Sequence, residues 1–145
     1  MLTIDDLRAS DTAVLHLKDA AGEPMFYVPT GGDPQKDKKP VLVELYGPGS
    51  DQYRQAQHTA KQRVMRLAKT DRKALEARSA DELKADAAEL LVSITARFDG
   101  LDTKGRALPG VLRELYADPK VGYITEQIDA FCAAWANFSP SAPQN

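Results

Sequence analysis

The 145-residue chain has a single cysteine, Cys132, only two histidines and no long apolar run. A single cysteine excludes an intrachain disulfide framework and is typical of a protein from a reducing compartment. Neither His16 nor His58 has cysteines or carboxylates at the spacing that a zinc site requires. The absence of a run of about 20 apolar residues argues against a membrane span, and the first residues lack the basic and apolar regions of a signal peptide. The sequence therefore predicts a cytoplasmic protein without a metal site or a membrane partner.

Signatures of catalysis are also missing. The glycine-containing turn at 46–51 precedes a predicted helix, but no P-loop lysine follows it and no G-x-G-x-x-G is present. Cys132 lies on or beside the apolar face of the last predicted helix, away from the basic groups that would lower its pKa. We therefore expect a buried, inert thiol, no catalytic residues, no cofactor and no enzymatic activity.

Charge is distributed unevenly along the chain, although the net charge is only −2. Residues 1–50 carry a net charge of −3, residues 51–78 carry +5, and residues 79–145 carry −4. The basic segment could be neutralised within the fold, or it could bind an acidic partner. A pI near 5.7 and a single aromatic residue in this segment argue against nucleic acid. The candidate partner-binding residues here are Arg54, Lys61, Arg63, Arg66, Lys69, Arg72 and Lys73.

Short strands are predicted in the first part of the chain. Alternating apolar residues predict strands at 12–18 and 41–47, and a β-branched and aromatic run predicts one at 24–28. Residues 29–40 contain three prolines and two glycines, which predicts an exposed, mobile loop. A short helical turn at 4–10 precedes the strands. Residues 1–47 are thus expected to form a small antiparallel sheet of about three strands.

Helical periodicity begins after the turn at residue 48 and continues to residue 138. Ser50 or Asp51 can cap a first helix over 51–78, whose apolar stripe thins beyond Ala68. The sequence "SADE" from Ser79 is a capping-box pattern, and the apolar face that follows it extends to Phe98. A short helix at 108–118, a last helix from Pro119 and a disordered tail at 139–145 complete the prediction. The expected fold class is α+β, with three to four helices following the sheet in one compact domain.

The last predicted helix ends in large aromatic residues. Apolar residues on one helix face are usually core, but aromatics at a fraying end need a neighbour, either the protein's own helices or another chain. The candidate partner-binding residues in this stripe are Phe131, Trp135 and Phe138.

Three stretches resemble a known family: "VELYGPGSDQYRQAQHTAKQRVMR" (43–66), the helix–"DG" loop–helix–"DP" pattern of 89–131, and "WANFSPS" (135–141). The pattern is similar to that of the tail assembly chaperones of long-tailed bacteriophages and prophages, over roughly two-thirds of the chain. The loop at 29–40 has no counterpart in that pattern, which leaves the subfamily open.

The resemblance implies a non-enzymatic role in the host cytoplasm during virion assembly. Such chaperones bind the tape measure protein, a long helical protein with extensive apolar faces, while tail tube subunits polymerise around it. The expected partners are therefore the tape measure protein, the tail tube protein and a second copy of the chain. Two alternatives remain open: a structural tail-completion component of the virion, and a nucleic-acid-binding regulator of a prophage.

Overall fold

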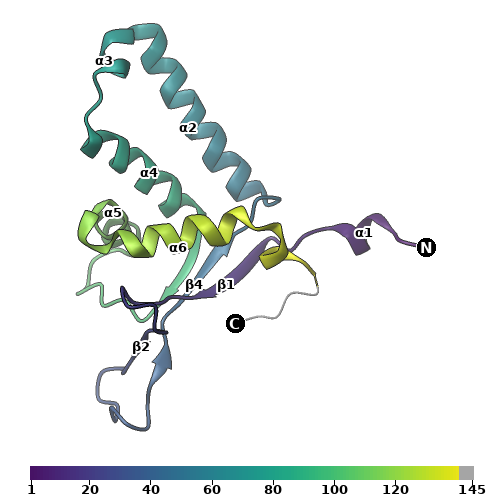
Figure 1. Cartoon of the computed structure of the whole chain (residues 1–145), viewed down its shortest axis with the longest axis vertical. Helices are drawn as coiled ribbons and strands as arrows, with labels where there is room; N and C mark the ends of the chain where they lie inside the picture. The colour runs from purple at the N-terminus through teal and green to yellow at the C-terminus, as the bar shows by residue number, and fades with distance from the viewer. Residues whose placement is uncertain (141–145) are drawn as a thin grey trace.

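The computed structural model describes residues 1–140 and has an α+β fold, in which helices pack on a small antiparallel sheet (Figure 1). The three-stranded sheet has the order β1-β4-β5, with β1 at Thr12–His16, β4 at Leu42–Tyr46 and β5 at Thr95–Asp99. The α-helices are α1 (Ile4–Leu7), α2 (Asp51–Thr70), α3 (Arg72–Glu76), α4 (Ala80–Ile94), α5 (Leu108–Ala117) and α6 (Gly122–Ala133). Two 3-10 helices, η1 (Pro119–Val121) and η2 (Trp135–Phe138), flank α6. Most of the predicted tail, from residue 141, lies outside the described residues.

The third strand of the main sheet comes from a segment that the sequence predicted as helix. The helix predicted to reach Phe98 ends at Ile94, and β5 then pairs with β4, with Val43 opposite Phe98. Thr95 marks the change, because its backbone is extended and its hydroxyl donates to the Leu91 carbonyl in the last turn of α4. The free edge of β4 offers a ladder of backbone hydrogen bonds, and this tertiary pairing overrides the local helical spacing.

The strand predicted at 24–28 is not part of that sheet. Only Phe26–Tyr27 (β2) is a strand, and it pairs with Lys39–Pro40 (β3) in a separate two-stranded sheet. Just beyond the end of β1, Pro24 forms an isolated bridge with Lys18, and the Met25 amide donates to the Leu17 carbonyl. The loop between β2 and β3 is largely exposed, as predicted, whereas its mobility stays a prediction.

Strands and helices share one hydrophobic core. Val43 and Leu45 of β4 are fully buried, and Ile94, Tyr116 and Ile128 cover the same face from α4, α5 and α6. The Tyr116 hydroxyl lies 2.9 Å from the Thr95 hydroxyl, so a polar group at the centre of the core has a hydrogen-bond partner. The predicted strand and helical regions are therefore parts of one packed unit.

The end of the chain differs from the predicted helix through residue 138. α6 stops at Ala133 and Ala134 is extended. The Asn137 side chain donates to the Phe131 carbonyl in the last turn of α6, which also accepts from the Ala134 amide. This turn places Phe138 in the core at 1% exposure, with its ring 5.5 Å from that of Phe131. Trp135 stays outside at 59% exposure.

Two buried titratable groups predict a loss of stability at alkaline pH. Burial raises the pKa of the Cys132 thiol to about 11 from an ordinary value of 9.0, and it raises the pKa of Tyr116 to about 12. The fold favours the neutral form of each group. The Cys132 contribution is therefore complete below about pH 9 and is lost as the pH rises through about 11. The Tyr116 contribution is complete below about pH 10 and is lost as the pH rises through about 12. The Cys132 share of the loss is about 2 kcal/mol.

Urea unfolding followed by circular dichroism at about pH 8 and about pH 11 measures this difference. The variant Cys132→Ala serves as the control, because it lacks the thiol and should show a smaller decrease between the two pH values. Equal decreases in the wild type and the variant would contradict the assignment to Cys132.

Candidate partner-binding site

The α2–α4 pair is anchored to the body only at its base. Ser50 caps α2 by accepting from the Tyr53 amide, and its own hydroxyl donates to the Gly47 carbonyl. In α2 only Ala56 is buried, and the buried residues of α4 begin at Ala88. Residues 57–87, hereafter the helical hairpin, contain no buried residue. In Figure 1 the two helices separate as they run from the body toward α3.

The hairpin nevertheless carries an apolar stripe. Val64, Met65 and Leu83 are 39%, 58% and 49% exposed, and Leu67 and Leu75 are only half-buried. An amphipathic helix normally buries such a stripe against another element. Exposed apolar surface rimmed by charge is typical of a site that binds another protein.

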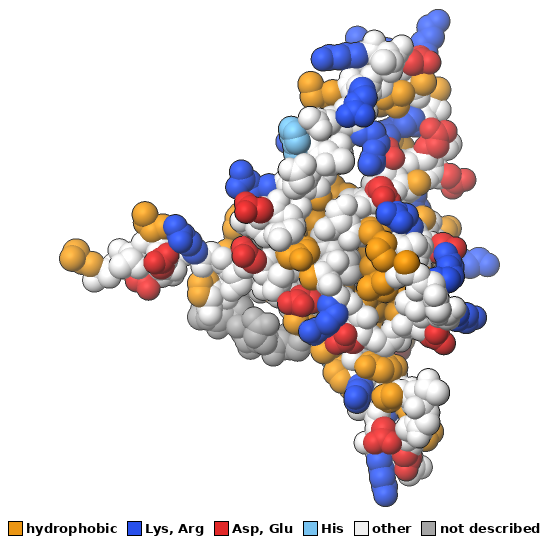
Figure 2. All heavy atoms as spheres, turned by 180° about the vertical axis from the view of Figure 1, so that it is seen from behind, with side chains coloured by type: hydrophobic (Ala, Val, Ile, Leu, Met, Phe, Trp, Pro, Cys, Tyr) orange, Lys and Arg blue, Asp and Glu red, His pale blue; other side chains and the backbone are white. Residues whose placement is uncertain are grey.

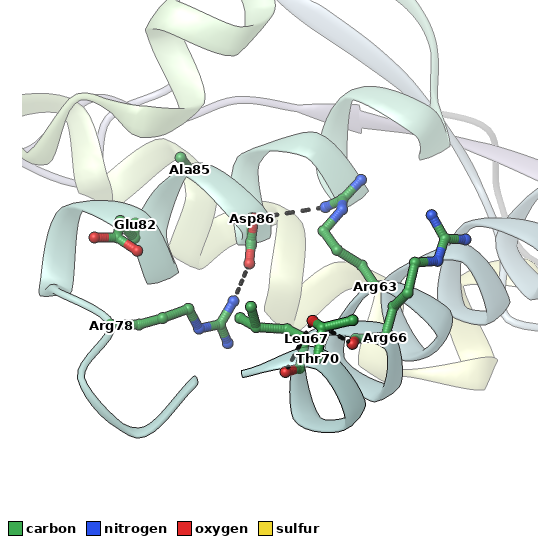
Figure 3. A pocket seen from close by; sticks show the side chains of 8 residues that line it. All are labelled: Arg63, Arg66, Leu67, Thr70, Arg78, Glu82, Ala85 and Asp86. Atoms are coloured by element: carbon green, nitrogen blue, oxygen red, sulfur yellow. Dashed lines mark hydrogen bonds and ion pairs between the residues drawn. The ribbon is translucent and has the colours of Figure 1, made fainter. Parts of the chain in front are cut away.

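An open cleft of about 500 Å³ lies between the outer parts of α2 and α4 (Figure 3). Its lining residues are Arg63, Arg66, Leu67, Thr70, Arg78, Glu82, Ala85 and Asp86. Two further depressions share Ala56, Thr59 and Ser93 in their lining and continue along the seam toward the body, one of similar volume and one of about 150 Å³. Side chains from two helices thus form a groove with an apolar centre at Leu67 and Ala85 and charged walls.

The charges of the cleft leave an excess of cations. Asp86 is shared by two guanidinium groups, Arg78, which is within hydrogen-bonding distance, and Arg63 at 3.6 Å (Figure 3). The Arg78 side chain is only 15% exposed, and its buried Nε has no hydrogen-bond partner within residues 1–140. Three arginines therefore face the two carboxylates of Glu82 and Asp86. Such a site can accept an additional carboxylate from a partner.

The predicted basic residues fall into two groups. Arg54, Arg63 and Arg72 pair with acidic side chains of the chain itself, Arg54 with Asp51 at 3.6 Å and Arg72 with Glu76 at 3.7 Å. The remaining four form no ion pair in the described part of the chain: Lys61, Arg66, Lys69 and Lys73. The structure brings Arg63 and Arg66 together in the cleft. Arg78 belongs to the predicted basic segment 51–78 but was not among the candidate partner-binding residues. The sequence prediction did not include the neighbours from the second helix, Glu82, Ala85 and Asp86.

The predicted aromatic residues do not form one exposed surface. Phe138 is buried, Phe131 is half-buried against it, and only Trp135 is open to a partner. The Trp135 ring lies over Gly49, next to the first turn of α2, because a Cβ atom on this glycine would be 3.4 Å from the ring. Trp135 is thus at the opposite end of α2 from the cleft.

Other chemistry is sparse in residues 1–140. The described part contains no group of His, Cys, Asp and Glu side chains that could hold a metal ion. No helix in it combines the length and the apolar character needed to cross a membrane. The His16 ring nitrogen lies 2.8 Å from the Met25 carbonyl and the ring packs on Phe26, which gives this histidine a structural role.

Comparisons of the chain with protein-family models, with curated proteins and with solved structures find no match. The functional argument therefore depends on the hairpin and its cleft.

Proposed function

We propose that this chain is a non-enzymatic binding protein that shelters an amphipathic helix of a larger protein, as a tail assembly chaperone does for the tape measure protein. The proposal depends on one observation. Residues 57–87 comprise the outer parts of α2 and α4 and the short α3 between them, and they have an apolar stripe and a cleft but no buried residue. A pair of helices that lacks its own core gains stability when a third helix fills the seam.

The physical requirements of such a chaperone agree with this geometry. A long amphipathic helix without a packing partner aggregates through its apolar stripe, and a groove between two helices covers that stripe by helix-in-groove binding. The charged walls would select a helix whose stripe is flanked by Asp or Glu. Charges at a rim influence association rate and specificity more than affinity, which suits a partner that must later be released. We place this event in the bacterial cytoplasm, where the tail tube protein is a second candidate partner.

Charge reversal in the cleft tests the proposal. The variant Arg63→Glu/Arg66→Glu/Lys69→Glu is expected to reduce recovery of the tape measure protein in a co-purification assay by more than about tenfold. The Asp and Glu residues beside the apolar stripe of the partner would then face glutamates in the cleft, and like charges repel. Arg63 has an intramolecular partner in Asp86. The double variant Arg66→Glu/Lys69→Glu therefore provides a version in which no internal ion pair is lost.

The matched control is Lys36→Glu/Lys38→Glu, which makes the same kind of charge change in the exposed loop between β2 and β3. Its recovery of the tape measure protein should equal that of the wild type. Unchanged recovery with the triple variant, together with an unchanged circular dichroism spectrum, would show that this surface is not the binding site.

The alternatives make different predictions. A tail-completion component would be present in purified virions, whereas a chaperone would be absent from them. A nucleic-acid-binding regulator would bind duplex DNA with an affinity that falls steeply as salt is added.

A further inference from the structure

The first residues form an apolar arm that contacts little of the rest of the described chain. Leu2, Ile4 and Leu7 are 76%, 73% and 67% exposed, and α1 projects away from the body (Figure 1). Figure 2 shows apolar side chains along this projection and basic side chains gathered at the outer end of the hairpin. Residues 1–9 are called the N-terminal arm below.

The arm has a defined local structure despite its exposure. The Thr3 hydroxyl accepts from the Asp6 amide at 3.3 Å, and the Asp6 carboxylate accepts from the Thr3 amide at 3.0 Å, which completes a capping box. A single helical turn is not stable by itself in water. An ordered turn that exposes a cluster of aliphatic side chains is therefore suited to a docking surface on another molecule.

With its helical turn formed, the arm cannot place Ile4 or Leu7 in the cleft of its own chain. Asp11 accepts from the Gly47 amide and Gly47 accepts from the Ser50 amide, so the base of the arm lies beside the N-terminus of α2. Leu67, at the centre of the cleft, is 17 residues farther along the chain from Ser50, or about 25 Å along the helix axis. Leu7 is four residues from Asp11, a reach of at most about 14 Å. Ile4 lies three helical residues farther, which adds about 5 Å, so both side chains fall short of Leu67.

We propose that the N-terminal arm of one molecule occupies the cleft of a second copy of this chain, and that the exchange is reciprocal and gives a closed dimer. Ile4 and Leu7 are three residues apart and share one helix face, which packs on the apolar centre at Leu67 and Ala85. Asp5 already pairs with Arg8 at 2.7 Å. Asp6 forms no ion pair within residues 1–140, and it is the carboxylate that meets Arg66 of the other copy.

Charge complementarity favours a second copy as the occupant. The hairpin contains eight basic and five acidic side chains, a net charge of +3, whereas the N-terminal arm has one basic and two acidic side chains, or −1, and the chain outside the hairpin carries −5 in all. Two copies that exchange arms bring the basic hairpin of each against the acidic body of the other. Symmetric pairing of this kind is the commonest form of oligomer.

The other exposed apolar residues offer no such complementarity. Phe26 and Val28 are 54% and 37% exposed, but the segment that contains them, residues 18–39, has four basic and four acidic side chains and no net charge. Trp135 is a single exposed aromatic rather than a cleft. The cleft is therefore the surface that combines apolar centre and opposite charge.

The dimer goes beyond the proposed chaperone function and does not depend on it, because the purified chain alone should form it. If both are correct, a partner helix and the arm compete for one cleft. If the wild-type chain is monomeric, the dimer proposal fails, but the cleft variants can still lose the tape measure protein in co-purification. The failure of the dimer and the failure of the chaperone function can therefore be distinguished.

Sedimentation velocity over a range of protein concentrations tests the dimer. The wild type is expected to shift from monomer to dimer as concentration rises. The variant Ile4→Ser/Leu7→Ser should raise the dimer dissociation constant by more than about tenfold, because each arm loses the burial of two aliphatic side chains. Phe26→Ser/Val28→Ser is the matched control and should dimerise like the wild type. A wild type that stays monomeric, or an arm variant that dimerises normally, would overturn the proposal.

Cross-linking shows whether the arm reaches the cleft. In a Cys132→Ala background, molecules carrying Leu7→Cys are mixed with molecules carrying Ala85→Cys and treated with a short bis-maleimide. A cross-linked heterodimer is expected, and a mixture in which Val28→Cys replaces Leu7→Cys should give none. Both arm and cleft positions are exposed, so these substitutions leave the fold intact. Equal cross-linking in the two mixtures would show that the arm does not occupy the cleft.

Discussion

Replacing Phe138 by alanine is expected to lower the free energy of unfolding by about 3–5 kcal/mol. The ring is 1% exposed and packs edge-on against Phe131. The Phe138 carbonyl also accepts a hydrogen bond of 2.6 Å from the Ser10 amide, so this residue connects η2 to the segment that leads into β1. Total stabilities of domains are only about 5–15 kcal/mol. Urea unfolding followed by circular dichroism would therefore show a large shift of the midpoint.

Trp135→Ala is the matched control, since it removes a larger aromatic side chain three residues earlier. At 59% exposure, its loss should cost less than about 1 kcal/mol. Similar losses for the two variants would contradict the assignment of Phe138 to the core and of Trp135 to the surface.

Gly47 provides a second check on the position of the Phe138 ring. A Cβ atom at this glycine would overlap the Phe138 ring. Gly47→Ala should therefore destabilise the wild type. It should cost less in the Phe138→Ala background, where the ring no longer occupies the space.

Local signals in the sequence were sufficient for much of the fold. Ser79 is the N-cap of α4 as predicted, and of the two candidates Ser50 and Asp51 it is Ser50 that caps α2. Alternation of apolar residues located the two strands that form the first ladder, β1 and β4. These features depend on residues close together in the chain, so their patterns can be read without knowledge of tertiary contacts.

The errors arose where distant contacts decide the outcome. Phe98 is four residues after Ile94, a spacing that fits a helix, but pairing with Val43 makes this segment a strand. Phe131 and Phe138 are seven residues apart and fit one helix face, but the extended Ala134 breaks the helix between them. In each case a tertiary contact competes with a local preference of similar size.

The candidate site was predictable only in part. Basic residues of α2, including Arg63 and Arg66, were recognisable from the charge distribution. The contribution of α4, above all Asp86, depends on the angle between the two helices, which no spacing in the sequence specifies. The sequence also could not show that the apolar stripe beyond Ala56 is exposed to solvent, because a buried stripe and an exposed one have the same periodicity.

Removal of the hairpin is expected to abolish binding of the tape measure protein and to leave the body folded. Replacing residues 61–84 by a six-residue Gly/Ser linker, which spans up to about 20 Å, removes most of a region without buried residues. The free energy of unfolding should change by less than about 1 kcal/mol, because Ala56, Ala88 and Leu91 and their contacts with the core remain. Urea unfolding measures the stability of the body, and co-purification measures binding of the tape measure protein.

As a control, the same linker replaces residues 31–37 of the exposed loop, which should preserve both stability and recovery. An unfolded body would mean that the hairpin is part of the core, and undiminished recovery would mean that the partner binds elsewhere.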